Sequence, residues 1–192
     1  MDEMMFFRKN AILDGLCKEW DTMWAACHDD RERLMRLVMM QQSIPYFATY
    51  CHNGKGLSKE YFLDTFGDYI NGYVFADCDD VEGYTYGMYV NPPTGTIIDV
   101  DVAHLMWCDS SYVIIPETKC PKLYISNDSD VHIALNGYSL IHVYLFDNSK
   151  VTIDDADEDS DVVVYKYSPT CGVEQGSYCF ATIKEFEKEL RI

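Results

Sequence analysis

Two hydrophobic rhythms divide the chain, and the first is helical. Between residues 9 and 66 apolar residues recur every three or four positions, which is the spacing of one face of an α-helix. The first stretch predicts one helix over residues 9–27, with the apolar set Leu13, Leu16, Cys17, Trp20, Trp24 and Cys27. Three more helices are predicted over residues 28–42, 43–54 and 57–67, capped by Asp29 or Asp30, Ser43 and Ser58.

From about Tyr69 onward, apolar positions alternate with polar ones, as they do on a half-buried β-strand. Six blocks can be superimposed, beginning at residues 111, 121, 129, 139, 149 and 160. Five of the six open with Ser, and the third and fifth positions are always Val, Ile or Leu. Because side chains on a strand alternate between two faces, these two positions share one face, which we expect to be the interior.

The connections between blocks are too short for helical crossovers, which need about a dozen residues. Either consecutive strands form antiparallel hairpins, or the chain winds in one direction and each strand lies beside a strand of the next coil. The regular repeat favours winding, with two blocks and about 20 residues per coil. The hairpin signal Asn136-Gly137 favours the alternative, an antiparallel β-sandwich or roll.

The last residues predict a helix that covers the open end of the final coil. Thr182 and Glu185 have the spacing of a capping box, and Ile183, Phe186 and Leu190 supply an apolar face. The predicted fold is therefore α+β: an N-terminal helical segment over residues 1–66, a short single-stranded β-solenoid (β-helix) over 67–181, and a C-terminal capping helix over 182–192.

The run GLSKEYFLDTFGDYINGYV, followed by blocks of the type DNSKVTI, resembles small uncharacterised proteins of Bacteroidota and their phages. The resemblance implies a helical N-terminal segment joined to a short β-solenoid, and a gene carried by a phage or mobile element. No activity is assigned to that family, so the resemblance implies no functional residues.

Charge and cysteine content limit the possible partners and compartments. The net charge is −17, and residues 67–192 carry 22 acids and 7 bases, against 10 and 8 in residues 1–66. This balance argues against direct binding to nucleic acid or to anionic membranes. No apolar run reaches the roughly 18 residues of a membrane helix. The eight cysteines form no CxxC pair, so we expect reduced thiols and a cytoplasmic protein in a bacterial host.

The sequence contains no pattern that predicts catalysis. The spacings G-x-S-x-G, GxGxxG and the P-loop are absent, so we expect no enzyme and no cofactor. His132 and His142 occupy outward fourth positions in their blocks, on different sheets if a coil holds two blocks, and no metal site is expected there. Arg31, Arg33 and Arg36 are interspersed with acids, which is typical of a solvated helix face rather than of a phosphate track.

The acidic run at residues 154–161 alternates aspartates but lacks the Gly and Glu of an EF-hand loop, since Ser160 and Lys166 stand at those places. It predicts a solvated acidic turn, with a calcium loop of another kind as the alternative.

The predicted function is a non-catalytic protein-interaction module that binds a protein partner through an acidic, Tyr-rich β surface. The candidate partner-binding residues are Tyr124, Tyr144, Tyr165, Tyr167, Asp155, Asp157, Asp159 and Asp161. These tyrosines could instead pack beneath the N-terminal helical segment, residues 1–66, which we call the helical head. Two alternatives remain: an anti-defence inhibitor that mimics nucleic acid and blocks a basic nucleic-acid enzyme, and a structural component of a virion or larger assembly.

Overall fold

The computed structural model describes residues 3–28, 30–38, 44, 48, 57–66, 73–78, 84–155, 159–176 and 178–186. Its helices are α1 (Glu3–Leu13), α2 (Lys18–Cys27), α3 (Arg31–Val38) and α5 (Lys59–Phe66). Its strands are β1 (Tyr73–Cys78), β2 (Tyr84–Val90), β3 (Thr96–Ile97), β4 (Ala103–Trp107), β5 (Ser111–Pro116), β6 (Lys122–Ile125), β7 (Asp130–Asn136), β8 (Leu140–Leu145), β9 (Lys150–Asp155), β10 (Asp161–Lys166), β11 (Gly172–Gln175) and β12 (Thr182–Glu185).

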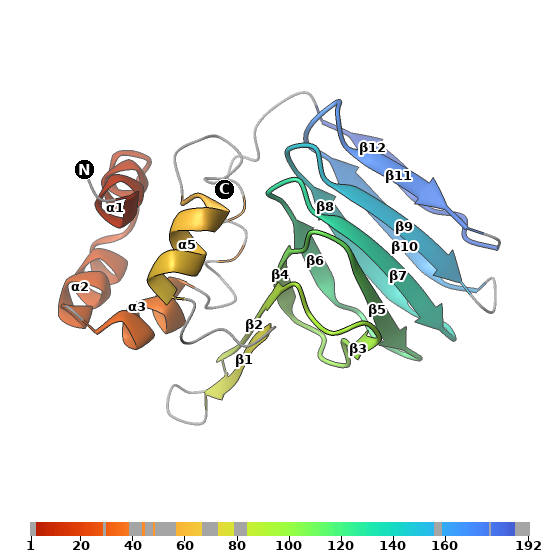
Figure 1. Ribbon diagram of the computed structural model, residues 1–192, viewed down its shortest axis with the longest axis horizontal. Coiled ribbons are helices and arrows are strands. Elements are labelled where there is room, and N and C mark those ends of the chain that lie inside the picture. Colours follow the sequence, from red (N-terminus) through yellow and green to blue (C-terminus); the bar gives the residue numbers. More distant parts are fainter. Residues whose placement is uncertain are drawn as a thin grey trace.

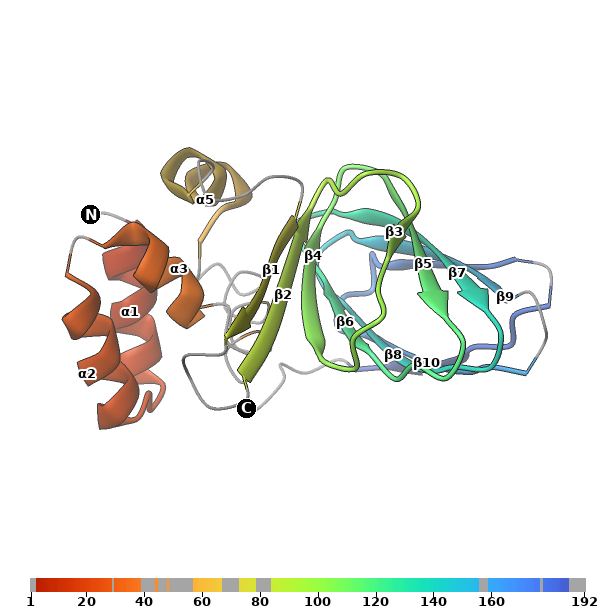
Figure 2. The same ribbon diagram turned by 90° about the horizontal axis from the view of Figure 1, so that it is seen from below.

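The strands wind into a β-solenoid with two sheets (Figures 1 and 2). From β2 to β12, successive strands alternate between a seven-stranded sheet, ordered β1-β2-β4-β6-β8-β10-β12, and a five-stranded sheet, ordered β11-β9-β7-β5-β3. Ser111 aligns with Val131, and Val131 aligns with Val151, so neighbouring coils are offset by 20 residues. The predicted winding and coil length are confirmed.

The antiparallel sandwich or roll is wrong for this chain, because every described strand pair except β1–β2 is parallel. Asn136-Gly137 does not form a hairpin. Gly137 has a φ of 96°, and it turns the chain from β7 in one sheet to β8 in the other. Left-handed φ values favour Gly at any tight corner, whether or not the flanking strands then pair.

The inward positions stack from coil to coil and form the core between the sheets. Val113, Val131, Ile133, Val143 and Val151 are all 0% exposed. Burying one such side chain contributes about 1.5–3 kcal/mol, so the repeated third and fifth positions stabilise the solenoid.

Stacked serine hydroxyls explain why most blocks open with Ser. Ser129 Oγ accepts a hydrogen bond from the backbone N–H of Cys108 (2.9 Å), and Ser149 Oγ accepts one from Ser129 (3.2 Å). At the other corner, Ser160 Oγ accepts from the N–H of Ser139 (3.2 Å). Each hydroxyl therefore satisfies a backbone group of the preceding coil where the chain leaves one sheet for the other.

The helical head differs from its prediction at the first helix. Residues 9–27 do not form one helix: α1 ends at Leu13 and α2 begins at Lys18, with Gly15 at a φ of 101° between them. A positive φ favours Gly, because a residue without a Cβ adopts the left-handed backbone conformation with little strain. Two predicted caps are confirmed, since Asp30 Oδ1 accepts from Arg33 N and Ser58 Oγ accepts from Tyr61 N. The predicted cap Ser43 and most of the predicted third helix lie outside the described residues.

The head lies at the end of the solenoid where the chain begins to wind (Figure 2). The rings of Phe62 on α5 and Trp107 on β4 meet edge to face, with centroids 5.3 Å apart. Lys59 Nζ also contacts Asp109 Oδ1 at 2.5 Å. Apolar residues of the helices and of the outer face of the seven-stranded sheet thus form one cluster, separate from the core inside the solenoid.

The predicted C-terminal helix is wrong for residues 182–185, which form strand β12. This strand pairs in parallel with β10, and Ile183 aligns with the inward-facing Val164. The open edge of β10 offers backbone hydrogen bonds, and the alternating pattern of Thr182–Glu185 continues the stack. These gains outweigh a local capping-box preference. Residues 187–192 of the predicted helix lie outside the described residues.

Candidate functional site

The outer face of the seven-stranded sheet carries three parallel rows of side chains, which we call the aromatic face. Two rows are Ala103–Lys122–His142–Val163–Thr182 and Leu105–Tyr124–Tyr144–Tyr165–Lys184. The third, Trp107–Ser126–Phe146–Tyr167–Phe186, continues the same register at and just past the strand ends. All four candidate tyrosines lie on this face, so the structure brings together the aromatic half of the predicted site.

The rings of the aromatic face stack along the axis of the solenoid. Tyr124 and Tyr144 have centroids 4.5 Å apart and planes 4° apart, and Tyr144 and Tyr165 follow at 4.7 Å and 8°. In the next row Tyr167 stacks on Phe146 at 5.0 Å and on Phe186 at 5.3 Å. Because neighbouring rings cover one another's faces, the ladder presents edges and hydroxyls, and it is no platform for stacked bases.

The head covers one end of the aromatic face. Leu105 and Trp107 are fully buried and Tyr124 is 6% exposed, whereas Phe186 at the far edge is 42% exposed. Burial, followed by the neighbouring tyrosines, raises the pKa of Tyr167 to about 12, and burial raises the pKa of Tyr124 further. Much of the tyrosine set therefore packs against or beneath the head as neutral phenols, and the accessible part lies near β12.

The aromatic face is not acidic. Its three rows contain Lys122 and Lys184 and no carboxylate, and Lys184 Nζ lies 5.3 Å from the ring centre of Tyr165. Burial and the charges of these two lysines lower the pKa of His142. A partner that docks here meets aromatic edges and positive charge.

The candidate aspartates lie elsewhere, around the turn from β9 to β10. Asp155 is 3% exposed and its carboxylate accepts a hydrogen bond from Ser160 N at 2.9 Å. The carboxylate therefore stabilises the turn and is not available to a partner. Asp159 and Asp161 are exposed, and Asp157 lies outside the described residues. Asp161 begins β10 on the same face as Tyr165, four residues before it, which is about 13 Å along a strand. Of the described candidate aspartates, Asp161 therefore lies at the margin of the aromatic face, whereas Asp155 and Asp159 belong to the turn.

Metal-binding and nucleophilic chemistry find little support in the described part of the chain. No group of three or more His, Cys, Asp or Glu side chains is arranged there to hold a metal ion. His132 and His142 lie on different sheets, as expected. Burial raises the pKa of the Cys108 and Cys171 thiols, which makes them weaker nucleophiles at neutral pH.

The last described coil, which we call the terminal coil, comprises β11, β12 and residues 178–186. It exposes large apolar side chains: Tyr178 (59%), Phe180 (80%), Ile183 (41%) and Phe186 (42%). Ile183 aligns with Val164, which is fully buried. The inward-facing column of the core is thus partly open at this end, and β12 and β11 are the outermost described strands of their sheets.

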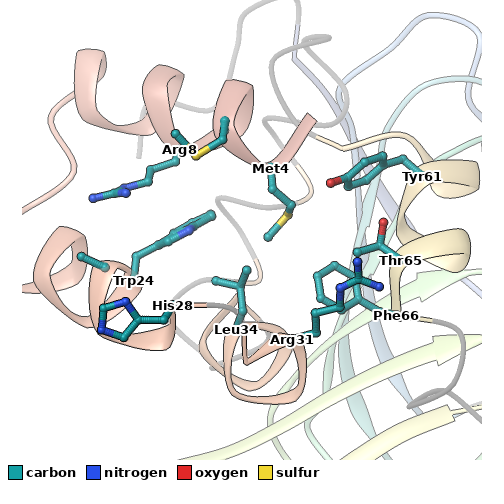
Figure 3. A pocket seen from close by; sticks show the side chains of 11 residues that line it. Met4, Arg8, Trp24, His28, Arg31, Leu34, Tyr61, Thr65 and Phe66 are labelled. Carbon is teal, nitrogen blue, oxygen red and sulfur yellow. The ribbon is translucent and has the colours of Figure 1, made fainter. Parts of the chain in front are cut away.

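The head contains a pocket of about 730 Å³ that sequence reasoning missed (Figure 3). Its lining residues are Met4, Met5, Arg8, Trp24, Ala25, His28, Arg31, Leu34, Tyr61, Thr65 and Phe66. These come from α1, α2, α3 and α5 and from the turn between α2 and α3. The arginines near residue 31 were the one sequence feature that pointed to this pocket, but their mixture with acids had indicated a solvated helix face.

No protein-family model, curated protein or solved structure matches the chain. Among the described residues, no helix is long and apolar enough to cross a membrane.

Proposed function

We propose that the chain is a non-catalytic protein-interaction module that binds one protein partner through its terminal coil and the adjoining end of the aromatic face. The observation that carries the proposal is the exposure of Phe180, Ile183 and Phe186 beside β12, which ends the described part of its sheet. Exposed apolar clusters of this kind mark interaction sites on folded proteins.

The partner that fits this surface is a protein that contributes an extended strand. The outer edge of an outermost strand offers backbone hydrogen-bond groups, and an added strand satisfies them while its alternate side chains enter the apolar cluster. Lys184 adds a positive charge beside the cluster, which favours a strand with acidic residues on one face.

The nucleic-acid mimic has less support, because the aromatic face carries no carboxylate and Asp155 is buried within its turn. A virion component remains the other alternative. The setting stays a prediction: a bacterial cytoplasm and a gene of a phage or mobile element.

A pull-down from a Bacteroidota lysate with matched variants tests the proposal. Phe180→Ser together with Tyr178→Ser should abolish retention of the partner, because both side chains are exposed and their loss leaves the fold intact. Tyr138→Ser is the control, since Tyr138 is 49% exposed in the turn between β7 and β8. Retention should survive a high-salt wash and the changes Asp159→Asn and Asp161→Asn.

Three results would contradict this assignment. A partner that is lost with the Asp159 and Asp161 variants or at high salt indicates a mimic of nucleic acid. Light scattering that gives twice the monomer mass for the wild type alone assigns the terminal coil to a second copy. Binding that begins only after residues 187–192 are removed assigns that surface to the chain's own end.

A further inference from the structure

We infer that the pocket in the helical head binds a small anion built on a planar ring, of the mononucleotide class. The pocket is independent of the terminal coil, and it has the volume of a small-molecule site, for which about 300–1,000 Å³ is typical.

The floor of the pocket is apolar and aromatic. Met4, Trp24 and Leu34 point into its middle from α1, α2 and α3 (Figure 3). Trp24 is 9% exposed and Phe66 is fully buried, and the Trp24 ring is braced by Phe7 at 5.5 Å between centroids. A rigid aromatic wall of this kind accepts a flat ring at little cost in conformational entropy.

Positive charge surrounds this floor, although the chain as a whole is acidic. Arg8, His28 and Arg31 line the pocket, and none of its described lining residues is an Asp or Glu. Asp21 Oδ1 holds the Arg8 guanidinium with contacts of 2.8 and 2.6 Å. Within the described part of the chain the side chains of His28 and Arg31 have no hydrogen-bond or ion-pair partner. Two unpartnered donors beside a fixed arginine favour an anionic group such as phosphate.

The backbone of His28 gives a second reason to assign this residue a role. It has a φ of 47° and a ψ of −120°, a conformation that glycine adopts readily and that costs other residues about 1–3 kcal/mol. Gly at this place would end α2 with less strain. The side chain at the rim of the pocket supplies what Gly lacks, a ring nitrogen that can bind an anion.

The opposite wall supplies hydroxyl groups. Tyr61 and Thr65 of α5 line the pocket beside Phe66 (Figure 3). Hydroxyls can both donate and accept hydrogen bonds, which suits the sugar of a nucleotide. The ring of a mononucleotide would thus lie against Trp24, its sugar beside the hydroxyls of α5, and its phosphate near His28 and Arg31.

Isothermal titration with the full chain tests the inference, with AMP, GMP, CMP and UMP as probes. At least one mononucleotide is expected to bind, and its nucleoside and inorganic phosphate are each expected to bind at least tenfold more weakly. Arg31→Gln should weaken binding about 10- to 100-fold, the usual effect of losing a charge-assisted hydrogen bond. Arg33→Gln is the control, because it makes the same charge change on α3 outside the pocket lining.

His28→Gly separates a binding role from a structural one. It should weaken mononucleotide binding severalfold while the melting temperature stays equal or rises, because the strained backbone is relieved. The inference is overturned if no mononucleotide binds at 1 mM, if inorganic phosphate binds as tightly as the nucleotide, if decanoate binds more tightly, or if Arg33→Gln weakens binding as much as Arg31→Gln.

Discussion

Removing one hydroxyl from the serine stack should destabilise the solenoid measurably. Ser129 is 1% exposed, accepts a hydrogen bond from the N–H of Cys108 at 2.9 Å and donates one to the carbonyl of Ser126. Ser129→Ala leaves the buried N–H of Cys108 without this acceptor where the chain leaves β4. The next serine of the stack, Ser149, already accepts a hydrogen bond from the N–H of Ser129.

The size of the effect follows from the burial of that N–H. An unsatisfied buried donor costs about 1–3 kcal/mol, so the free energy of unfolding should fall by about 2 kcal/mol. For a chain of this size the melting temperature should fall by roughly 4–8 °C. Urea unfolding followed by circular dichroism measures the first quantity, and a thermal scan measures the second. Hydrogen exchange of the Cys108 amide should also accelerate.

Ser110→Ala is the matched control, because Ser110 is exposed in the adjacent turn. Its effect on the free energy of unfolding should stay within about 0.5 kcal/mol. A Ser129→Ala variant as stable as the wild type, or one no less stable than Ser110→Ala, would refute a stabilising role for the serine stack.

Three further changes test the packing and electrostatics. Gly87→Ala would place a Cβ against the imidazole of the buried His104, so it should cost about 1–3 kcal/mol. A double-mutant cycle with His104→Ala should show positive coupling, and additive costs would contradict the contact. Burial lowers the pKa of His104 and of His142, so the unfolded chain binds more protons than the folded chain below pH 6.5. The free energy of unfolding should therefore fall as the pH decreases from 6.5, by up to about 1.4 kcal/mol per pH unit for the buried His104 and by less for the partly buried His142. Equal urea midpoints at pH 7.5 and 5.5 would exclude this effect. Hydrogen bonds to Lys59 and Asn91 lower the pKa of Asp109, but its side chain is exposed. Asp109→Asn should therefore lower the free energy of unfolding in urea by less than about 1 kcal/mol. A larger decrease would show that the Lys59–Asp109 ion pair anchors the head.

The hydrophobic rhythm by itself determined which positions of each strand face inward, and it favoured the solenoid over the antiparallel alternative that the structure excludes. Third and fifth positions such as Val131 and Ile133 face inward because side chains alternate between the two faces of a strand, and every block alternates apolar and polar residues in the same way. The spacing of the blocks excluded helical crossovers and gave the coil length. Asp30 and Ser58 were identifiable as caps because a cap acts within its own turn.

Tertiary structure decided where local and long-range preferences compete. Thr182–Glu185 satisfies both a capping box and an alternating strand, and the open edge of β10 selected the strand. Gly15 breaks a helical rhythm that the apolar residues alone would continue. At residues 182–185 the spacing is compatible with two structures and the partner strand separates them, whereas at Gly15 the left-handed backbone ends the helix locally.

The candidate surfaces depended still more on tertiary structure. Asp155 and Asp161 are close in sequence, but Asp155 is buried at the end of β9 whereas Asp161 is exposed at the start of β10 in the other sheet. The head then buries Tyr124 and leaves Phe186 exposed. The pocket collects side chains from four helices, and no local pattern encodes that convergence. Periodicity fixes which way a side chain faces along its own strand or helix, whereas its neighbours across the fold depend on how those elements pack.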